Sequence, residues 1–82
     1  MNLTEAKTGE DVLVKDVNTD DELKSFLFTL GCYKGEIITL ISKKRGGYVL
    51  SIKDARYNID EDLAKMIEVE SQASFFLRGK VS

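Results

Sequence analysis

Two clusters of carboxylates are the residues of this sequence best suited to bind a hard cation. Residues 20–22 read Asp-Asp-Glu, and residues 60–62 read Asp-Glu-Asp. Carboxylate oxygens are the ligands that magnesium prefers, and ferrous iron also accepts them. Each cluster, however, stands where a helix is expected to begin, and acidic side chains at that position cap the helix and interact favourably with its dipole. We therefore interpret both clusters as helix starts and predict no metal site.

The sequence lacks the residue types that most catalytic centres need. It contains no histidine, the commonest general base and transition-metal ligand, and Cys32 is its single cysteine. One cysteine without histidine cannot form a thiolate–imidazolium pair or a four-ligand zinc site. An enzyme would have to rely on carboxylates, lysines and tyrosines alone. We therefore predict that the protein is not an enzyme and uses no cofactor.

Residues 31–35, Gly-Cys-Tyr-Lys-Gly, contain two glycines, as phosphate-binding loops do. The segment lacks the Gly-Lys-Ser/Thr ending that places a lysine and a magnesium ligand, and it follows a helix instead of preceding one. We interpret it as a backbone corner, in which Gly31 ends the helix and Gly35 lets the chain enter a strand. Cys32 is expected to pack beside this corner as a small apolar side chain.

Three consecutive bases, Lys43, Lys44 and Arg45, stand at the tip of a predicted hairpin, and Tyr33 and Tyr48 are the aromatic residues expected nearest to them. Bases beside aromatic rings on a small barrel are typical of proteins that bind single-stranded nucleic acid, which is the alternative function. The isoelectric point near 5.1 favours a solvated loop or a protein contact instead. We expect no nucleic-acid partner.

Length and composition indicate one small globular domain. The 82 residues are 43% hydrophobic and 32% charged, with a net charge of −2, which argues against disorder. Residues 23–57 carry seven bases and two acids between acidic flanks, so they form either a solvated surface or one that faces an acidic partner. No apolar run exceeds three residues, and the acidic N-terminus does not resemble a signal peptide. With one cysteine, this predicts a reduced, cytoplasmic protein that does not insert into the membrane.

A helix is expected over about residues 20–30. Its apolar residues recur at i, i+3, i+4 and i+7, so they share one face, which we expect to be buried. These residues are Leu23, Phe26, Leu27 and Leu30. Thr19 and Glu22 form a predicted capping box at its start, and Gly31 supplies the left-handed residue at its end.

Five short strands are expected around this helix, within residues 12–17, 37–41, 48–52, 57–59 and 66–69. The valines of the first are spaced by two and then three residues, which suggests a bulge. The continuous β-branched run of the second predicts burial on both faces or a tight curve. Turns at 44–47 and 53–55 form hairpins, and Asp60 can cap a short helical turn before the last strand. The pattern predicts a mainly β fold, a small closed or partly closed barrel of five strands with one helix between the first and second.

Residues 71–82 are expected to form a C-terminal tail outside a domain of residues 1–70. Small and polar residues there surround one apolar cluster, Phe75-Phe76-Leu77. Fraying is the common fate of a polar terminus, but exposing three such side chains to water is unfavourable. We therefore predict that Phe75 and Phe76 pack onto the barrel or onto a neighbouring subunit, as in a homodimer.

Taken in order along the chain, these features resemble the FeoA family, the small accessory proteins of bacterial ferrous-iron transport. That family enters its first strand through Pro/Thr-Gly-Glu, here residues 8–10, and its helix ends in a Leu-Gly-x-x-x-Gly corner, here residues 30–35. The closing pattern of the family matches Ala64, Ile67 and Val69. Two positions depart from it, because Lys34 replaces a common proline and Asp54 replaces a glycine often found in that turn.

The resemblance covers residues 1–70 and implies an SH3-like barrel. It also implies a non-enzymatic cytoplasmic adaptor that contacts FeoB, the membrane permease with a cytoplasmic GTP-binding domain. The same barrel occurs in iron-dependent repressors of the diphtheria-toxin-repressor type, whose DNA-binding domain and metal ligands this sequence lacks. The residues that we expect at a partner contact are Tyr33, Lys43, Lys44, Arg45, Tyr48, Phe75 and Phe76.

Overall fold

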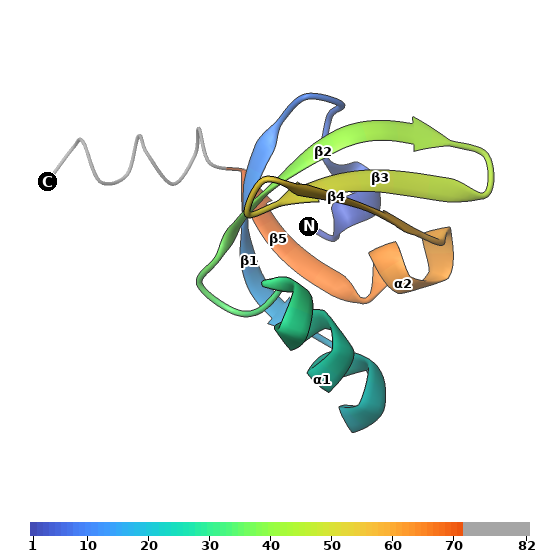
Figure 1. Cartoon of the computed structure of the whole chain (residues 1–82). Coiled ribbons are helices and arrows are strands. Elements are labelled where there is room, and N and C mark those ends of the chain that lie inside the picture. Colours follow the sequence, from blue (N-terminus) through green and yellow to red (C-terminus); the bar gives the residue numbers. More distant parts are fainter. Residues whose placement is uncertain (72–82) are drawn as a thin grey trace, which may run out of the picture.

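The computed structural model describes residues 1–71 and shows a mainly β fold (Figure 1). In chain order, its elements are the 3-10 helix η1 (Leu3–Glu5), β1 (Asp11–Val17), α1 (Asp21–Leu30), β2 (Ile37–Lys44), β3 (Gly47–Ile52), β4 (Ala55–Ile59), α2 (Glu61–Lys65) and β5 (Ile67–Ser71). The strands form one antiparallel sheet in the order β4-β3-β2-β1-β5. The expected fold class is therefore confirmed. In the described part of the chain β4 and β5 are edge strands that do not pair with each other, so the barrel is partly open.

Two β-bulges bend the sheet around its core. The register with β5 shifts in β1 between Val14 and Asp16, and the register with β3 shifts in β2 between Leu40 and Ser42. An extra residue in one strand increases the local twist and moves the following side chains by one position. This explains why three valines of β1 face the core despite their uneven spacing, as predicted. In β2 the tight-curve interpretation holds, since Ile37 is exposed and burial on both faces is ruled out.

Two tight turns connect the central strands at the predicted places. β2 and β3 join through Arg45 and Gly46, and β3 and β4 join through Lys53 and Asp54. The φ angles of Lys53 and Asp54 are 48° and 70°. Two consecutive positive φ angles give a turn whose twist matches that of the flanking strands. Asp54 thus adopts the left-handed conformation itself, which aspartate tolerates better than most residues.

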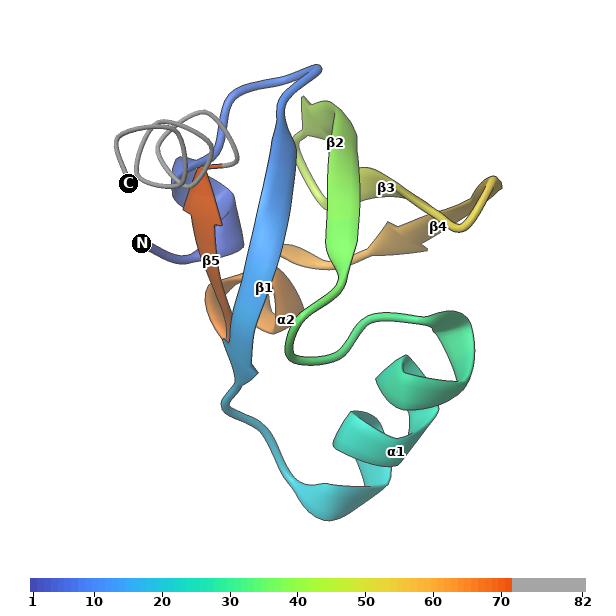
Figure 2. The ribbon, with the colours of Figure 1, turned by 90° about the vertical axis from the view of Figure 1, so that its left-hand side faces the viewer.

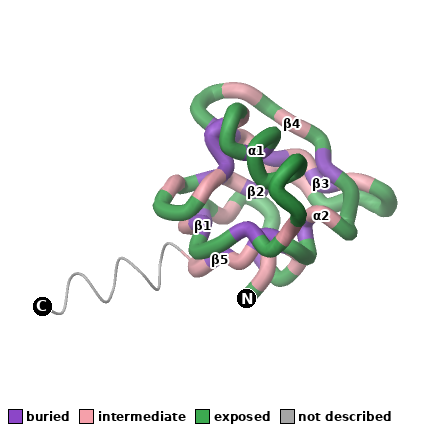
Figure 3. The backbone as a smooth tube through the Cα atoms, turned by 90° about the horizontal axis from the view of Figure 1, so that it is seen from below, coloured by how far each residue is buried: buried purple, intermediate pink, exposed green. Residues whose placement is uncertain are grey.

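Apolar side chains from the strands fill the barrel. Tyr48, Leu50 and Ile52 of β3 alternate inward as predicted, and Leu3 of η1 and Ala64 of α2 are fully buried with them. Figure 3 shows the buried segments along the strands, whereas α1 is mostly exposed. The core therefore belongs to the barrel, and α1 is attached to it from outside.

α1 begins at an aspartate cap. The Asp20 side chain accepts a hydrogen bond from the Leu23 N–H at 2.8 Å, so Asp20 is the N-cap and Thr19 lies outside the helix. The predicted capping box of Thr19 and Glu22 is therefore wrong by one residue. The physical reason is that a charged aspartate stands three residues before Leu23, which is the spacing that a side-chain cap needs.

α1 projects below the strands in Figure 2 and buries a narrower face than its sequence predicted. Leu27 is fully buried and Leu30 is partly buried against the core, but Leu23 is 38% exposed and Phe26 is 55% exposed. The prediction that Phe26 shares the buried face is wrong. Because the helix stands away from the sheet, only a narrow stripe around Leu27 finds a surface to pack against.

α2 is the predicted short helical turn between β4 and β5. Its cap is Asp60, whose side chain accepts a hydrogen bond from the Leu63 N–H at 2.8 Å. Met66, expected in the last strand, instead donates its N–H to the Leu63 carbonyl and is the exposed C-cap of α2, so β5 begins at Ile67. None of the helices within residues 1–71 has the length and apolar character that a membrane span requires.

Candidate functional site

The corner between α1 and β2 has the glycine conformations that the sequence predicted. Gly31 has a φ of 99°, and the N–H groups of Gly31 and Cys32 both donate to the carbonyl of Leu27, which closes the last turn of α1. Gly35 has a φ of 97° and donates its N–H to the carbonyl of Val14 at 2.9 Å. The corner is thus hydrogen-bonded to the helix at one end and to β1 at the other.

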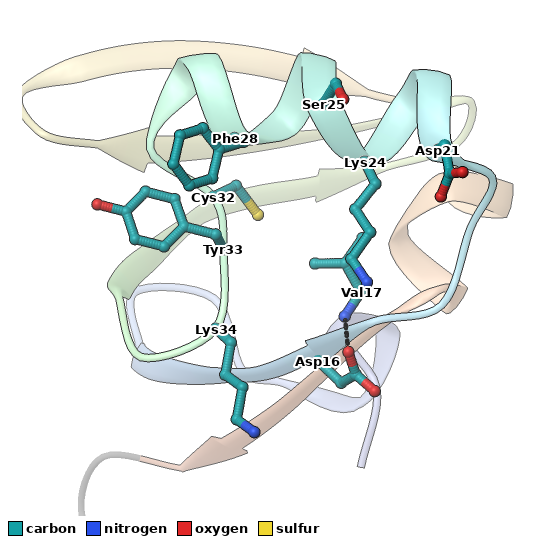
Figure 4. A pocket seen from close by; sticks show the side chains of 9 residues that line it. All are labelled: Asp16, Val17, Asp21, Lys24, Ser25, Phe28, Cys32, Tyr33 and Lys34. Carbon is teal, nitrogen blue, oxygen red and sulfur yellow. Dashed lines mark hydrogen bonds between the residues drawn. The ribbon is translucent and has the colours of Figure 1, made fainter.

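A hollow of about 530 Å³ lies between α1, the end of β1 and this corner (Figure 4). It is lined by Asp16, Val17, Asp21, Lys24, Ser25, Phe28, Cys32, Tyr33 and Lys34, and we refer to it as the α1–β2 hollow. The rings of Phe28 and Tyr33 lie side by side, with centroids 4.6 Å apart and an interplanar angle of 33°. Phe28 is nevertheless 61% exposed, so the pair covers only part of its surface.

The lining of the α1–β2 hollow suits the side chain of a protein partner. Val17 and Cys32 are buried and provide an apolar base, while two acids and two lysines supply charges of both signs around it. Exposed aromatic rings next to an apolar base are the usual anchors of protein interfaces, and mixed charges around them select the partner's orientation. The Asp16 carboxylate already accepts a hydrogen bond from the Val17 N–H at 2.8 Å, which fixes its position (Figure 4).

Cys32 packs as the small apolar side chain that the sequence predicted. It is 1% exposed, and burial raises the pKa of its thiol to about 11 from an ordinary value of 9.0. The thiolate is the reactive form of cysteine. Cys32 therefore contributes packing to the base of the α1–β2 hollow rather than a nucleophile.

We expect the Cys32 thiol in the native protein to react with Ellman's reagent at pH 8 about 100-fold more slowly than in urea-unfolded protein, since both burial and the raised pKa suppress the thiolate. Rapid labelling of the native thiol would contradict its assignment as a buried packing residue.

The raised pKa of the Cys32 thiol also predicts that the stability of the protein depends on pH. The unfolded thiol loses its proton near pH 9 and the folded thiol near pH 11, so the contribution of the thiol is complete below pH 9 and declines between 9 and 11. A Cys32→Ala variant should lack this decline in the free energy of unfolding between pH 9 and 11.

The remaining predicted contact residues are not assembled at one place. Lys43, Lys44 and Arg45 lie exposed at the tip between β2 and β3, and the Lys43 ammonium donates to the carbonyl of Thr4 at 2.8 Å. Tyr48 is only 8% exposed. Tyr33 precedes β2, whose eight residues separate it from the tip by about 25 Å.

The stacking platform that the nucleic-acid alternative needs is therefore not formed by these residues. Base stacking requires an exposed ring beside the cations, whereas Tyr48 is a core residue and Tyr33 belongs to the α1–β2 hollow. Phe75 and Phe76 lie outside the described residues.

The two carboxylate clusters act as helix starts, because Asp20 and Asp60 each cap their helix through one oxygen. Within residues 1–71, no three His, Cys, Asp or Glu side chains are grouped so that they could hold a metal ion.

Of the residues that line the α1–β2 hollow, the sequence predicted Tyr33 as a contact residue but not Phe28 or Lys24. The available signal was that Phe28 falls outside the apolar stripe of its helix, which indicates an exposed aromatic ring.

A match to a known family model identifies the kind of domain in which this hollow lies. The family model of the FeoA domain matches residues 1–71. The chain belongs to the FeoA domain family. This confirms the resemblance drawn from the sequence, and family membership supports a role in ferrous-iron transport. FeoA domains are small SH3-like accessory domains and are not a known catalytic family.

Solved structures share the fold of this FeoA domain. The iron(II) transport protein A of Clostridium thermocellum is 24% identical with a TM-score of 0.81, and the match covers 89% of this chain and 46% of that one. The FeoA protein of Chlorobium tepidum is 20% identical with a TM-score of 0.79, covering 87% and 70%. The zinc-bound ScaR structure is 23% identical with a TM-score of 0.77, covering 87% of this chain but 36% of that one, so this chain spans about a third of ScaR. Comparison with curated proteins found no match.

Proposed function

We propose that this FeoA domain is a non-enzymatic accessory protein of ferrous-iron uptake that binds a FeoB-type permease, either directly or through its cytoplasmic GTP-binding domain. Family membership over residues 1–71 supports the transport process. The protein works in the cytoplasm and reaches the membrane through that partner. The contact domain extends to Ser71, the last residue of β5, and residues 72–82 are a separate tail.

The observation that carries the proposal is the ring pair in the α1–β2 hollow, in which Phe28 is exposed and Tyr33 is half-buried. Exposing a phenylalanine ring to water is unfavourable, and burying the ring in an interface stabilises the complex by about 1.5–3 kcal/mol. Phe28 belongs to α1, which projects from the barrel (Figure 2), and Tyr33 belongs to the corner that follows it. Lys24 and Lys34 beside the hollow can pair with acidic side chains of that partner, and the two aspartates of the hollow can pair with its bases.

The bases at the β2–β3 tip form a second, weaker contact in this proposal. Lys44 and Arg45 are exposed and carry positive charge at a point far from the α1–β2 hollow. Exposed ion pairs contribute little affinity but accelerate association with an acidic partner, and salt screens them. Charge reversal at these two positions should therefore slow association more than it speeds dissociation.

The proposal is tested by measuring binding of the full chain to the permease's GTP-binding domain, and to the whole permease in lipid nanodiscs, by calorimetry. Phe28→Ser and Tyr33→Ser are each expected to weaken binding about tenfold or more. Phe26→Ser is the matched control, because Phe26 is similarly exposed on the same helix but does not line the hollow. This control should bind as the unsubstituted chain does.

Two outcomes would contradict the proposal. Absence of binding to both forms of the permease would remove FeoB as the partner. Unchanged binding by both ring variants would show that the α1–β2 hollow is not the contact surface. A steep loss of affinity for single-stranded RNA with rising salt would instead favour the nucleic-acid alternative.

A further inference from the structure

A second apolar surface lies on α1 toward α2 and β4. This groove of about 340 Å³ is lined by Leu23, Phe26, Asn58, Ile59, Asp60, Asp62, Leu63 and Met66, and we refer to it as the α1–α2 groove. Three of the exposed large apolar side chains among residues 1–71 line it, namely Leu23, Phe26 and Met66. Single exposed apolar side chains are ordinary, but a cluster of three along one groove is typical of a docking site.

Residues 72–82 have the composition that this groove would bind. Phe75-Phe76-Leu77 is a continuous apolar run, it is followed by Arg78 and Lys80, and residues 72–82 contain no acid. The groove combines apolar side chains with the carboxylates of Asp60 and Asp62. The apolar run therefore matches the apolar lining, and the two bases match the two acids in sign.

The tail of the same chain is poorly placed to fill the groove. Met66 of the groove precedes β5, and Ser71 ends β5, so about 17 Å of strand separates them. Phe75 and Phe76 are four and five residues beyond Ser71, so a fully extended tail spans about 14–18 Å and reaches at most the Met66 end of the groove. The tail of the same chain also cannot fold back and pair along the outer edge of β5 at this point, because the carbonyl of Met1 already accepts the Val69 N–H at 2.8 Å.

We propose that the α1–α2 groove binds the C-terminal segment of a second copy of this chain. Phe75 or Phe76 enters the apolar part of the groove, and Arg78 and Lys80 lie near Asp60 and Asp62. Each copy gives its tail and receives its partner's, so the exchange closes as a two-fold symmetric dimer. The inference is independent of the permease contact, which uses the opposite side of α1.

The size of the groove predicts a reversible dimer. Each buried phenylalanine removes about 150–250 Å² from water, and a groove of about 340 Å³ has room for one or two rings. Two such contacts bury less than the about 1,200–2,000 Å² of a standard stable interface. We therefore expect dimers to form at concentrations between about 10 µM and 1 mM, with the ion pairs weakened by added salt.

The test is sedimentation of the full chain over that range of concentration. We expect a concentration-dependent dimer whose dissociation constant rises about tenfold or more in Phe26→Ser and in the double variant Phe75→Ser/Phe76→Ser. Phe28→Ser is the matched control, since Phe28 is similarly exposed on α1 but lines the α1–β2 hollow. A labelled peptide of residues 71–82 should also bind the double tail variant, and Phe26→Ser introduced into that variant should abolish this binding.

Each alternative outcome overturns the proposal. A chain that remains monomeric to about 1 mM has no such exchange. A dimer that survives the double tail substitution is not held by the tail. A dimer weakened equally by Phe28→Ser uses the α1–β2 hollow instead. Because Phe28→Ser tests permease binding and Phe26→Ser tests dimerisation, failure of one proposal leaves a different pattern from failure of the other.

Discussion

Replacing Leu27 by alanine is expected to lower the free energy of unfolding by about 2–5 kcal/mol. Leu27 is fully buried and is the residue of α1 that enters the core of the described chain. A ten-residue helix has little stability of its own, so α1 depends on this contact to remain folded against the barrel. Small domains are stable by only about 5–15 kcal/mol, so the loss is a large share. Equilibrium urea unfolding followed by circular dichroism measures it.

Phe26→Ala is the matched control for Leu27→Ala. Both residues are large, apolar and adjacent in the same helix, but Phe26 is more than half exposed. Its replacement should change the free energy of unfolding by less than about 1 kcal/mol. Similar losses from the two variants would show that α1 packs in a different rotation about its axis.

Gly31→Val is expected to destabilise the protein by about 2–5 kcal/mol for two separate reasons. The φ of 99° lies where a side chain is strained. In addition, a Cβ at this position would lie 2.9 Å from Cγ2 of Ile52 and 3.0 Å from Cε of Lys53. Lys53 can move aside, but Ile52 is buried in the core and cannot. Thermal or urea unfolding would show the effect, and an unchanged midpoint would contradict the assigned helix end.

The two causes are separated by alanine substitutions at both corner glycines. Gly35 has nearly the same φ, 97°, but nothing lies within 4 Å of a Cβ added there. Gly35→Ala should therefore cost only the backbone strain, about 1–2 kcal/mol. Gly31→Ala should lower the free energy of unfolding by more than Gly35→Ala does, because its Cβ also meets the Ile52 side chain. Equal effects would mean that close approach to β3 is unimportant at Gly31.

Local features of the fold followed from the sequence because they depend on residues a few positions apart. The spacing of the β1 valines predicted the bulge, Gly31 predicted the end of α1, and Lys53-Asp54 predicted a tight turn. Family membership was likewise readable from the Leu-Gly-x-x-x-Gly corner, and the comparison confirmed it. The error in the cap of α1 was of one residue, because threonine and aspartate stood next to each other and both can cap a helix.

Four of the nine residues that line the α1–β2 hollow belong to α1, and local sequence patterns do not determine how this helix is placed against the barrel. A helical period predicts which side chains share a face, but it does not say how much of that face meets another element. The position of α1 outside the barrel leaves Phe26 and Phe28 exposed on opposite surfaces, and it brings Phe28 to Tyr33. The sequence had placed Phe26 in the core and had given Phe28 no role.

The sequence by itself determined that this is a small mainly β domain of the FeoA family, with no histidine and a single cysteine, because composition and short-range spacing suffice for that. Only the tertiary structure decided which residues meet. It separated Tyr33 from Lys43, Lys44 and Arg45 by the length of β2 and buried Tyr48. It also joined α1, β4 and α2 into one groove, because these contacts link residues far apart in the chain and arise only when the barrel has curled.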